Sequence, residues 1–162
     1  MAIYLPELAP HDISFPPLHR ALAEPDGLLA MGGDLSVQRL INAYSSAIFP
    51  WFSEGDPLLW WSPSVRAVFA PDSLTLNRTL KKQIRRHQLH FSINKAFAQV
   101  VALCAAPREK QPGTWILPQM QQAYLQLHRQ GHAHSIEVWQ QDKLVGGLYG
   151  VLVGSLFCGE SM

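Results

Sequence analysis

The sequence predicts an α+β layered fold that follows a loop-rich N-terminal segment. Residues 1–64 are crowded with proline, glycine and aromatic residues, whereas the chain after residue 65 alternates between strand-like and helix-like patterns. Hydrophobic residues make up 48% of the 162 residues and charged residues only 15%, which is typical of a globular protein with a real core. The order predicted after residue 65 is β-α-β-α-α-β-β-β, as in helices layered on a sheet.

The N-terminal segment is predicted to hold one short helix among rigid loops. Asp34 or Ser36 can cap this helix, in which Leu40 and Tyr44 recur at helical spacing. After it, the stretch AIFPWFSEGDPLLWWSP sets large rings between prolines, which forbid a continuous helix.

Four tryptophans could either fill the core or stack on a ligand. Trp60 and Trp61 are predicted to pack in the core. Trp51 lies in the proline-fixed FPWF loop and Trp115 in PGTW, after a loop that should be exposed. Loop aromatics suit stacking on an unpaired base, so for these two residues packing and stacking both remain open.

The second part of the chain is predicted to form a sheet with three helices. Helices are expected at 73–87, 97–104 and 118–130, and Asn94 is expected to cap the second of them. Strands are expected at 66–70, 89–93, 135–139, from 144 onward, and at 155–158. Gly131 sits where a C-terminal cap glycine belongs. Because apolar residues dominate the last strands, the sheet is expected to be largely buried.

A basic cluster lies on the predicted helix at 73–87. Its cations recur at spacings of three and four and so largely share one side: Arg78, Lys81, Lys82, Arg85 and Arg86. No acidic residue lies between positions 74 and 90, although the net charge of the whole chain is only +1. This local concentration favours contact with phosphates, and a merely solvated helix face is the alternative.

Glu160 is the candidate catalytic residue. It arrives on an apolar strand, where an unpaired carboxylate would be costly to bury. It therefore either pairs with a cation in a structural role or faces a cleft and meets a ligand, and we favour the cleft. Cys158 is expected to be a buried, unactivated thiol. His132 and His134 lack a third ligand at suitable spacing, so no metal site is predicted.

The chain shows no signal peptide and no apolar run near the roughly 20 residues that span a bilayer. We therefore expect a cytoplasmic protein without membrane contact. A near-neutral total charge gives no argument for DNA binding.

Several motifs together closely resemble one enzyme family. They are EPDGLLAMGGDLS, AIFPWFSEGDPLLWWSPSVRAV, GTWI, AYLQLHRQGHAHSIEVWQQDKLVGGLYGV and SLFCGESM, in order over essentially the whole chain. This combination resembles the leucyl/phenylalanyl-tRNA–protein transferases. The resemblance implies a small N-terminal domain over residues 1–64, followed at 65–162 by a partial α/β/α domain similar to the GNAT acyltransferases.

The resemblance also implies an enzymatic activity. Members of the family move Leu, Phe and, less well, Met from aminoacyl-tRNA to the N-terminal Arg or Lys of a protein, which marks that protein for N-end rule degradation. The chemistry is aminolysis of an ester that already carries the driving force, so no cofactor or metal is expected. The expected partners are Leu-tRNA, Phe-tRNA and proteins with N-terminal Arg or Lys.

Site residues follow from the positions that match the family. The residues implied near the tRNA 3′ adenosine are Trp51, Trp115, Tyr44 and Tyr124. Those implied to line an apolar pocket for the amino-acid side chain are Leu148, Phe157 and Met162. Those implied to contact the tRNA backbone are Lys81, Lys82, Arg85 and Arg86. Glu160 matches a family position involved in substrate binding.

Members of the family continue well beyond GESM, so we expect the chain to be truncated at its C-terminus. This leaves a second interpretation open, in which the chain binds aminoacyl-tRNA or a protein N-terminus without turnover. A small-molecule GNAT acetyltransferase is a third interpretation. It would require a glycine-rich pyrophosphate loop leading into a helix, which we do not find.

Overall fold

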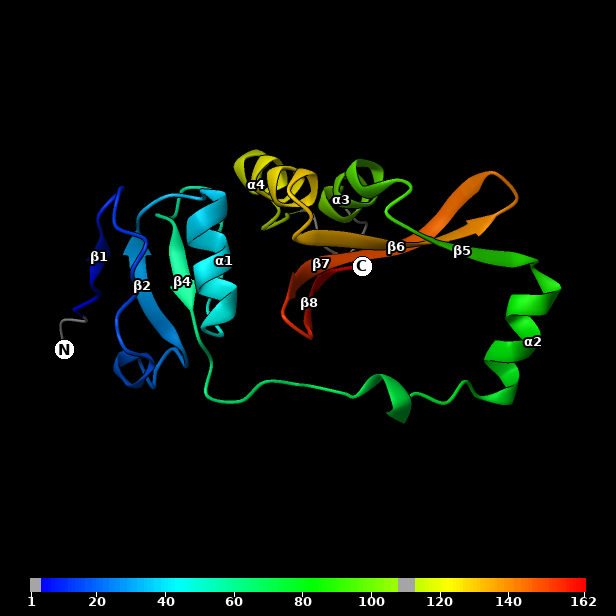
Figure 1. Cartoon of the computed structure of the whole chain (residues 1–162), viewed down its shortest axis with the longest axis horizontal. Helices are drawn as coiled ribbons and strands as arrows, with labels where there is room; N and C mark the ends of the chain where they lie inside the picture. Colours follow the sequence, from blue (N-terminus) through cyan, green and yellow to red (C-terminus); the bar gives the residue numbers. More distant parts are fainter. Residues whose placement is uncertain (1–3, 108–112) are drawn as a thin grey trace.

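The computed structural model describes residues 4–107 and 113–162. The chain forms two sheets, joined by a long linker that runs below them in Figure 1. The fold is mixed α+β, as expected. The predicted domain boundary at residues 64 and 65 falls at the start of this linker and stays a prediction.

The first sheet has four short strands in the order β1-β2-β4-β3. Their bounds are β1 Glu7–Leu8, β2 Leu28–Gly32, β3 Phe49–Pro50 and β4 Leu59–Trp61. A 3-10 helix, η1 (Leu18–Arg20), precedes β2. Trp60 lies at the centre of this unit with no exposed surface, and its Nε1 donates to the carbonyl oxygen of Gly32 at 2.9 Å. The predicted core role of Trp60 is therefore confirmed, whereas Trp61 is half-buried.

Helix α1 (Val37–Ser45) is the predicted N-terminal helix. Ser36 caps it by accepting from the N–H of Arg39 at 3.4 Å, and Asp34 accepts from the N–H of Ser36 in turn. Leu40 and Tyr44 are buried on one face of the helix. That face packs against α4 and β7 of the second part of the chain.

The strand predicted in the linker is not formed. Residues 66–70 were expected to form a strand, but they are extended without a partner strand and are exposed to solvent. Their apolar pattern fits a strand only if a neighbouring strand supplies hydrogen bonds, which the described residues do not. A 3-10 helix, η2 (Pro71–Ser73), follows, and then α2 (Arg78–Arg86), which is shorter than predicted because Asn77 caps it.

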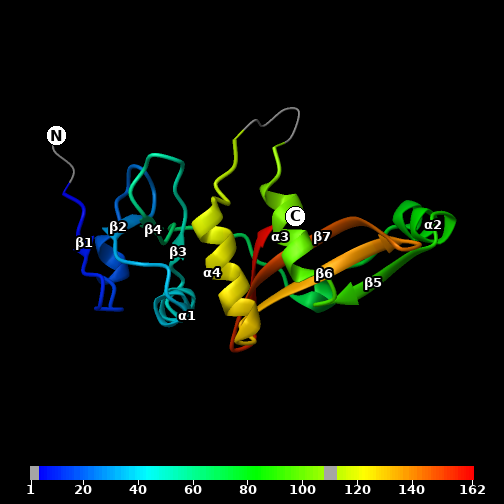
Figure 2. The same cartoon turned by 90° about the horizontal axis from the view of Figure 1, so that it is seen from above.

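The second sheet is antiparallel, with the order β5-β6-β7-β8. Its strands are β5 Leu89–Ile93, β6 Ala133–Gln140, β7 Lys143–Val153 and β8 Leu156–Ser161. Helices α3 (Phe97–Ala105) and α4 (Pro118–Arg129) lie side by side on one face (Figure 2). Both helices match their predicted positions, and Gly131 has the positive φ of a C-terminal cap.

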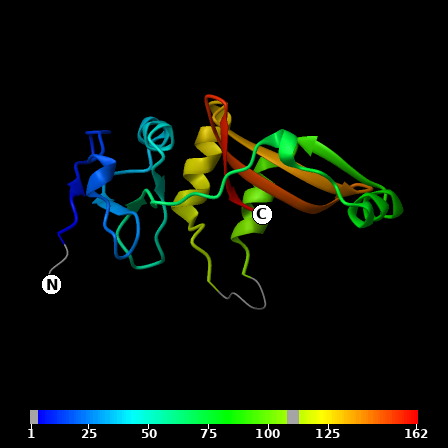
Figure 3. The same cartoon turned by 90° about the horizontal axis from the view of Figure 1, so that it is seen from below.

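The opposite face of this sheet is open, so the expectation of a largely buried sheet is wrong. Phe91, Ile93 and Ile136 share this face and are exposed. Figure 3 shows the sheet from the side of the linker. The strands carry apolar residues on both faces, but among the described residues α3 and α4 cover only one of them.

The predicted cap of α3 is also wrong. Asn94 does not cap the helix; its side chain accepts from the N–H of Ser135 and contacts the ring of His134. The carboxylate of Glu137, from β6, instead accepts from the N–H of Ala96 at the start of α3. The predicted loop before Trp115 includes residues 108–112, which lie outside the described residues.

Candidate functional site

The candidate site centres on a chain of hydroxyl groups that ends on Glu160. The Oη atoms of Tyr44, from α1, and Tyr124, from α4, lie 2.9 Å apart. Tyr124 donates to Oε2 of Glu160, on β8, at 2.7 Å. Because the hydrogen of Tyr124 is used on Glu160, Tyr44 is the donor to Tyr124. The chain of hydrogen bonds thus joins the N-terminal unit to the helix layer and the last strand.

A bulge in β8 sets the direction of the carboxylate. Gly150 of β7 pairs with Gly159, whereas Tyr149, the residue before Gly150, pairs with Ser161. Glu160 is therefore the extra residue, and it lies with Ser161 opposite a single partner residue. The hydrogen bond from Tyr124 shows that the carboxylate points toward the helix layer.

Opposing effects act on the ionisation of Glu160. Burial raises the pKa of its carboxyl group, while the hydroxyl groups of Tyr124 and Tyr44 and the positive charge of Arg66 partly oppose this rise. The net pKa stays above its usual value. Burial also raises the pKa of Tyr44 and of Tyr124 well above the ordinary phenol value, so both remain hydrogen-bond donors at neutral pH.

Tyr149 adds a third phenol beside Glu160. Its ring packs edge-on against that of Tyr124, with centroids 5.1 Å apart, and against Phe97 at 6.0 Å. Its hydroxyl group is buried without a hydrogen-bond partner among the described residues. Sequence reasoning missed this residue, because it reads as one more apolar position of an alternating strand.

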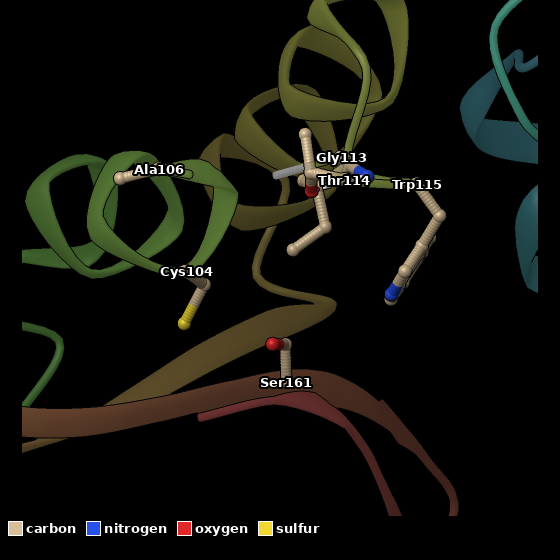
Figure 4. Close-up of a pocket in the computed structure, with 7 residues that line it drawn as sticks. Cys104, Ala106, Gly113, Thr114, Trp115 and Ser161 are labelled. Carbon is tan, nitrogen blue, oxygen red and sulfur yellow. Dashed lines mark hydrogen bonds between the residues drawn. The ribbon is translucent and has the colours of Figure 1, made fainter. Parts of the chain in front are cut away.

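A small pocket of about 60 Å³ adjoins this cluster. It lies between the end of α3, the segment before α4 and the bulged end of β8 (Figure 4). The residues that line it are Cys104, Ala106, Gly113, Thr114, Trp115, Ile116 and Ser161. Since Ser161 follows Glu160 directly, the pocket brings Trp115 to the same end of β8 as the carboxylate.

The two loop tryptophans are placed differently. Trp51 is 48% exposed, and its ring packs edge-on against Trp61 at 5.5 Å. The Nε1 of Trp61 donates to the carbonyl oxygen of Trp51 at 2.7 Å, which fixes the loop. Trp115 is half-buried in the pocket wall. Tyr44 and Tyr124 are buried and contribute hydroxyl groups to the cluster rather than exposed ring faces.

The residues expected to line the side-chain pocket do not share one cavity. Leu148 pairs with Ile136 and Phe157 with Leu152, so both lie on the open face of the second sheet. Met162 lines a groove of about 300 Å³ on the helix side. The other residues of that groove are Val100, Leu103, Cys104, Leu144, Val145, Gly146 and Gly147.

The basic cluster is carried by α2, at the far end of the molecule from the N-terminal sheet (Figure 1). The cluster is exposed to solvent over most of its length, and its members are Arg78, Lys81, Lys82, Arg85 and Arg86. Arg66, on the linker, is a further cation that sequence reasoning missed. Its guanidinium lies 4.7 Å from the centre of the Phe49 ring. No local sequence signal predicts this contact.

Two residues that could suggest other chemistry have plain roles. Cys158 is partly buried, and burial together with the charge of Glu160 raises the pKa of its thiol, against a smaller opposing effect of Arg66. A raised pKa leaves little thiolate at neutral pH. His134 contacts Asn94. In the part of the chain that the structure describes, no three His, Cys, Asp or Glu residues gather as a metal site would require.

Together these groups can hold a polar substrate but do not form an activated nucleophile. Glu160 offers a carboxyl group fixed by a phenol donor, which suits the binding of an amine or a hydroxyl group. Aromatic rings lie on the neighbouring loops, and cations lie on the linker and on α2. No described helix is long and apolar enough to cross a membrane.

Comparison with known proteins gives a single family over nearly the whole chain. The family model described as leucyl/phenylalanyl-tRNA protein transferase matches residues 68–162, and the model of its N-terminal domain matches residues 33–64. The first match covers α2 to β8, and the second covers α1, β3 and β4.

Curated relatives agree with these matches. The leucyl/phenylalanyl-tRNA–protein transferase of Shewanella piezotolerans is 60% identical over 149 residues, which are 92% of this chain and 63% of the relative. That of Psychromonas ingrahamii is 57% identical over 162 residues, 100% of this chain and 68% of the relative. The chain thus spans about two thirds of the length of the curated relatives it matches. On this agreement of motifs, family models and relatives, the chain belongs to the leucyl/phenylalanyl-tRNA–protein transferase family.

Proposed function

We propose that the protein transfers Leu or Phe, and less well Met, from aminoacyl-tRNA to the N-terminal Arg or Lys of acceptor proteins. The observation that carries this proposal is the buried Tyr44–Tyr124–Glu160 chain in a member of this family, beside a pocket walled by Trp115. The reaction would mark acceptor proteins for N-end rule degradation. Because aminoacyl-tRNA is a cytoplasmic substrate, we place the protein in the cytoplasm.

The proposed reaction is aminolysis of the ester between the amino acid and the tRNA 3′ ribose. The acceptor amine attacks the carbonyl carbon, a C–N bond forms, the C–O bond to the ribose breaks, and the ribose oxygen regains a proton from the amine. An enzyme accelerates such a step by holding the amine close to the carbonyl and by keeping it deprotonated. Glu160 has acceptor capacity left beyond its bond to Tyr124, and in this proposal it holds the acceptor amine.

Binding of the terminal adenosine is assigned to the aromatic residues. Trp51 offers an exposed ring and Trp115 a wall of the pocket, whereas Tyr44 and Tyr124 support Glu160. Trp51→Ala and Trp115→Ala should each weaken binding of aminoacyl-adenosine by about 1–3 kcal/mol, because a stacking surface is removed. Titration of a non-hydrolysable aminoacyl-adenosine measures this change. Unchanged affinity in both variants would show that the two tryptophans pack within the protein and do not stack on the adenine.

Three apolar residues stay assigned to the amino-acid side chain: Leu148 and Phe157, on the open face of the second sheet, and Met162, in the groove on its helix side. A hydrophobic pocket distinguishes side chains that differ by one methylene group by only about 1–3 kcal/mol, which is consistent with acceptance of Leu, Phe and Met together. A sheet whose one face carries two helices is compatible with a GNAT-like fold, and that likeness is part of the proposal.

The test is transfer of labelled Phe from Phe-tRNA to two peptides, one that begins with Arg and one that begins with Ala. The relative from Psychromonas ingrahamii serves as a positive control. Label on the Arg peptide alone supports the proposal. Binding of Phe-tRNA without transfer, under conditions in which the relative is active, would favour the alternative of a non-catalytic binding fragment. Absence of both binding and transfer would contradict the proposal.

A further inference from the structure

Arg66 is held beside the candidate site without a polar partner of its own. Its guanidinium carbon lies over the ring of Phe49, 4.7 Å from the ring centroid, while the residue stays exposed to solvent. Within residues 4–107 and 113–162, Arg66 makes no hydrogen bond or ion pair. A cation–π contact uses no hydrogen bond, so the N–H groups of the guanidinium remain available to a ligand.

The surroundings of Arg66 belong to the site. Phe49 begins the strand that leads through Pro50 to the exposed Trp51, and it pairs with Trp61. The positive charge of Arg66 also partly opposes the rise in the pKa of the Glu160 carboxyl group and in that of the Cys158 thiol. Arg66 is therefore near both the loop proposed to stack on the adenine and the carboxyl group proposed to hold the amine.

One nucleotide presents all the groups that these residues would meet. The terminal adenosine carries the ester on its ribose, its base is free to stack, and a phosphodiester at its 5′ oxygen joins it to the preceding nucleotide. If the ester lies at Glu160 and the base on a tryptophan, the phosphodiester lies one ribose away from both. Arginine binds such a group by two parallel N–H···O bonds, which a lysine cannot match.

We propose that Arg66 binds the phosphodiester on the 5′ side of the terminal adenosine of aminoacyl-tRNA. This inference rests on the proposed function. It assigns to the linker a direct part in placing the tRNA 3′ end, separate from any contact between α2 and the tRNA body. The cation–π contact with Phe49 would hold the guanidinium in place before the tRNA arrives, which lowers the entropic cost of binding.

The test uses two non-hydrolysable probes that differ by one group. The first is 3′-deoxy-3′-(phenylalanylamino)adenosine, and the second is the same molecule with a methyl phosphodiester at its 5′ oxygen. The native chain should bind the second probe more tightly, by about tenfold at low salt. In Arg66→Gln this preference should disappear while affinity for the first probe is retained. Arg20→Gln, which removes the same charge from η1, is the matched control and should keep the preference.

Salt dependence gives a second readout. For the native chain, the slope of log affinity against log salt should be steeper for the second probe, by about 0.7. Arg66→Gln should remove this difference, and Arg66→Lys should retain most of the slope but reduce the affinity. If Arg66→Gln weakens both probes equally, Arg66 acts on the ester or on Glu160 and the inference is wrong. If the native chain binds neither probe, the proposed function fails before this inference is reached.

Discussion

At the scale of single residues, two neighbouring tyrosines are expected to respond in opposite ways to the removal of one oxygen. The buried hydroxyl group of Tyr149 has no partner among the described residues, whereas that of Tyr124 bridges Tyr44 and Glu160. Tyr149→Phe should leave the free energy of unfolding unchanged or raise it by about 1 kcal/mol, and Tyr124→Phe should lower it by about 1–3 kcal/mol. Urea denaturation of both variants measures the difference. Equal decreases would mean that Tyr149 also has a partner in solution.

Glu160 and Glu137, both held by hydrogen bonds, are expected to give opposite pH dependence. The pKa of Glu160 is raised, mainly by burial, so the folded state binds its proton more tightly than the unfolded state does. The protonated carboxyl group therefore contributes to the free energy of unfolding below the unfolded pKa, and this contribution is lost as pH rises through the folded pKa. For Glu137, burial acts to raise the pKa, but hydrogen bonds from Ser135, Ser92 and the N–H groups of Ala96 and Lys95 hold it below its usual value. Its contribution is therefore present above the unfolded pKa and is lost as pH falls through the folded pKa.

These signs predict how the glutamine variants differ from the native chain. Glu160→Gln should have the higher free energy of unfolding at neutral pH, and its advantage should shrink toward about pH 4, where the native carboxyl group is protonated. Glu137→Gln should be less stable than the native chain at neutral pH and should approach it as pH falls. Denaturation curves between neutral pH and about pH 4 measure the Glu160 trend, and their extension to about pH 2 measures the Glu137 trend. The same slope for both variants would contradict the assigned pKa directions.

At the scale of elements, the seating of β8 depends on a glycine of β7. A Cβ atom at Gly150 would collide with the carbonyl oxygen of Cys158 and with the ring of Phe157. Gly146 is the matched control, because it lies on the same face of β7 and a Cβ atom there would meet Val138 at an ordinary 3.7 Å. Gly150→Ala should lower the free energy of unfolding by about 1–3 kcal/mol, since β8 must shift, whereas Gly146→Ala should change it little.

The same shift should be visible at the site, because β8 carries Glu160. Amide hydrogen exchange of β8 should therefore increase in Gly150→Ala and not in Gly146→Ala. Protection of β8 that is equal in the two variants would show that the bulged strand tolerates the extra carbon.

Elements set by local pattern could be predicted, and those set by distant residues could not. The apolar spacing of Phe97, Val100 and Cys104 predicted α3 correctly, because a helix face is encoded within a few turns. The strand predicted at 66–70 failed because its apolar residues have no strand beside them, which no local pattern indicates. The Asn94 cap failed because Glu137, far along the chain, supplies the acceptor for the start of α3.

In the candidate site too, some residues could be predicted from local pattern, but the contacts between distant residues could not. Glu160 stood out in the sequence as a carboxylate on an apolar strand, and motifs located the tryptophans. The hydrogen bonds that join Tyr44, Tyr124 and Glu160 required three elements to meet, and the contact of Arg66 with Phe49 depends on the path of the linker.

At the scale of the whole molecule, the candidate reaction centre and the basic helix are far apart. The Tyr44–Tyr124–Glu160 chain lies where α1 meets α4 and β8, whereas α2 projects from the opposite end of the second sheet (Figure 1). A tRNA that places its 3′ end at Glu160 could reach α2 only with another part of its backbone. Affinity for the body of the tRNA and affinity for its aminoacylated end should therefore respond to different substitutions.

Neutralising α2 tests this separation. The variant replaces Lys81, Lys82, Arg85 and Arg86 with glutamine, which favours helix and leaves the Asn77 cap in place. Affinity for Phe-tRNA should fall, and the slope of log affinity against log salt should flatten by about 0.7–0.9 for each phosphate that the helix no longer neutralises. Affinity for aminoacyl-adenosine should not change, because that probe has no backbone to reach α2. An unaltered salt slope for Phe-tRNA would make α2 a solvated helix face, and weaker binding of aminoacyl-adenosine would show that the two regions are coupled.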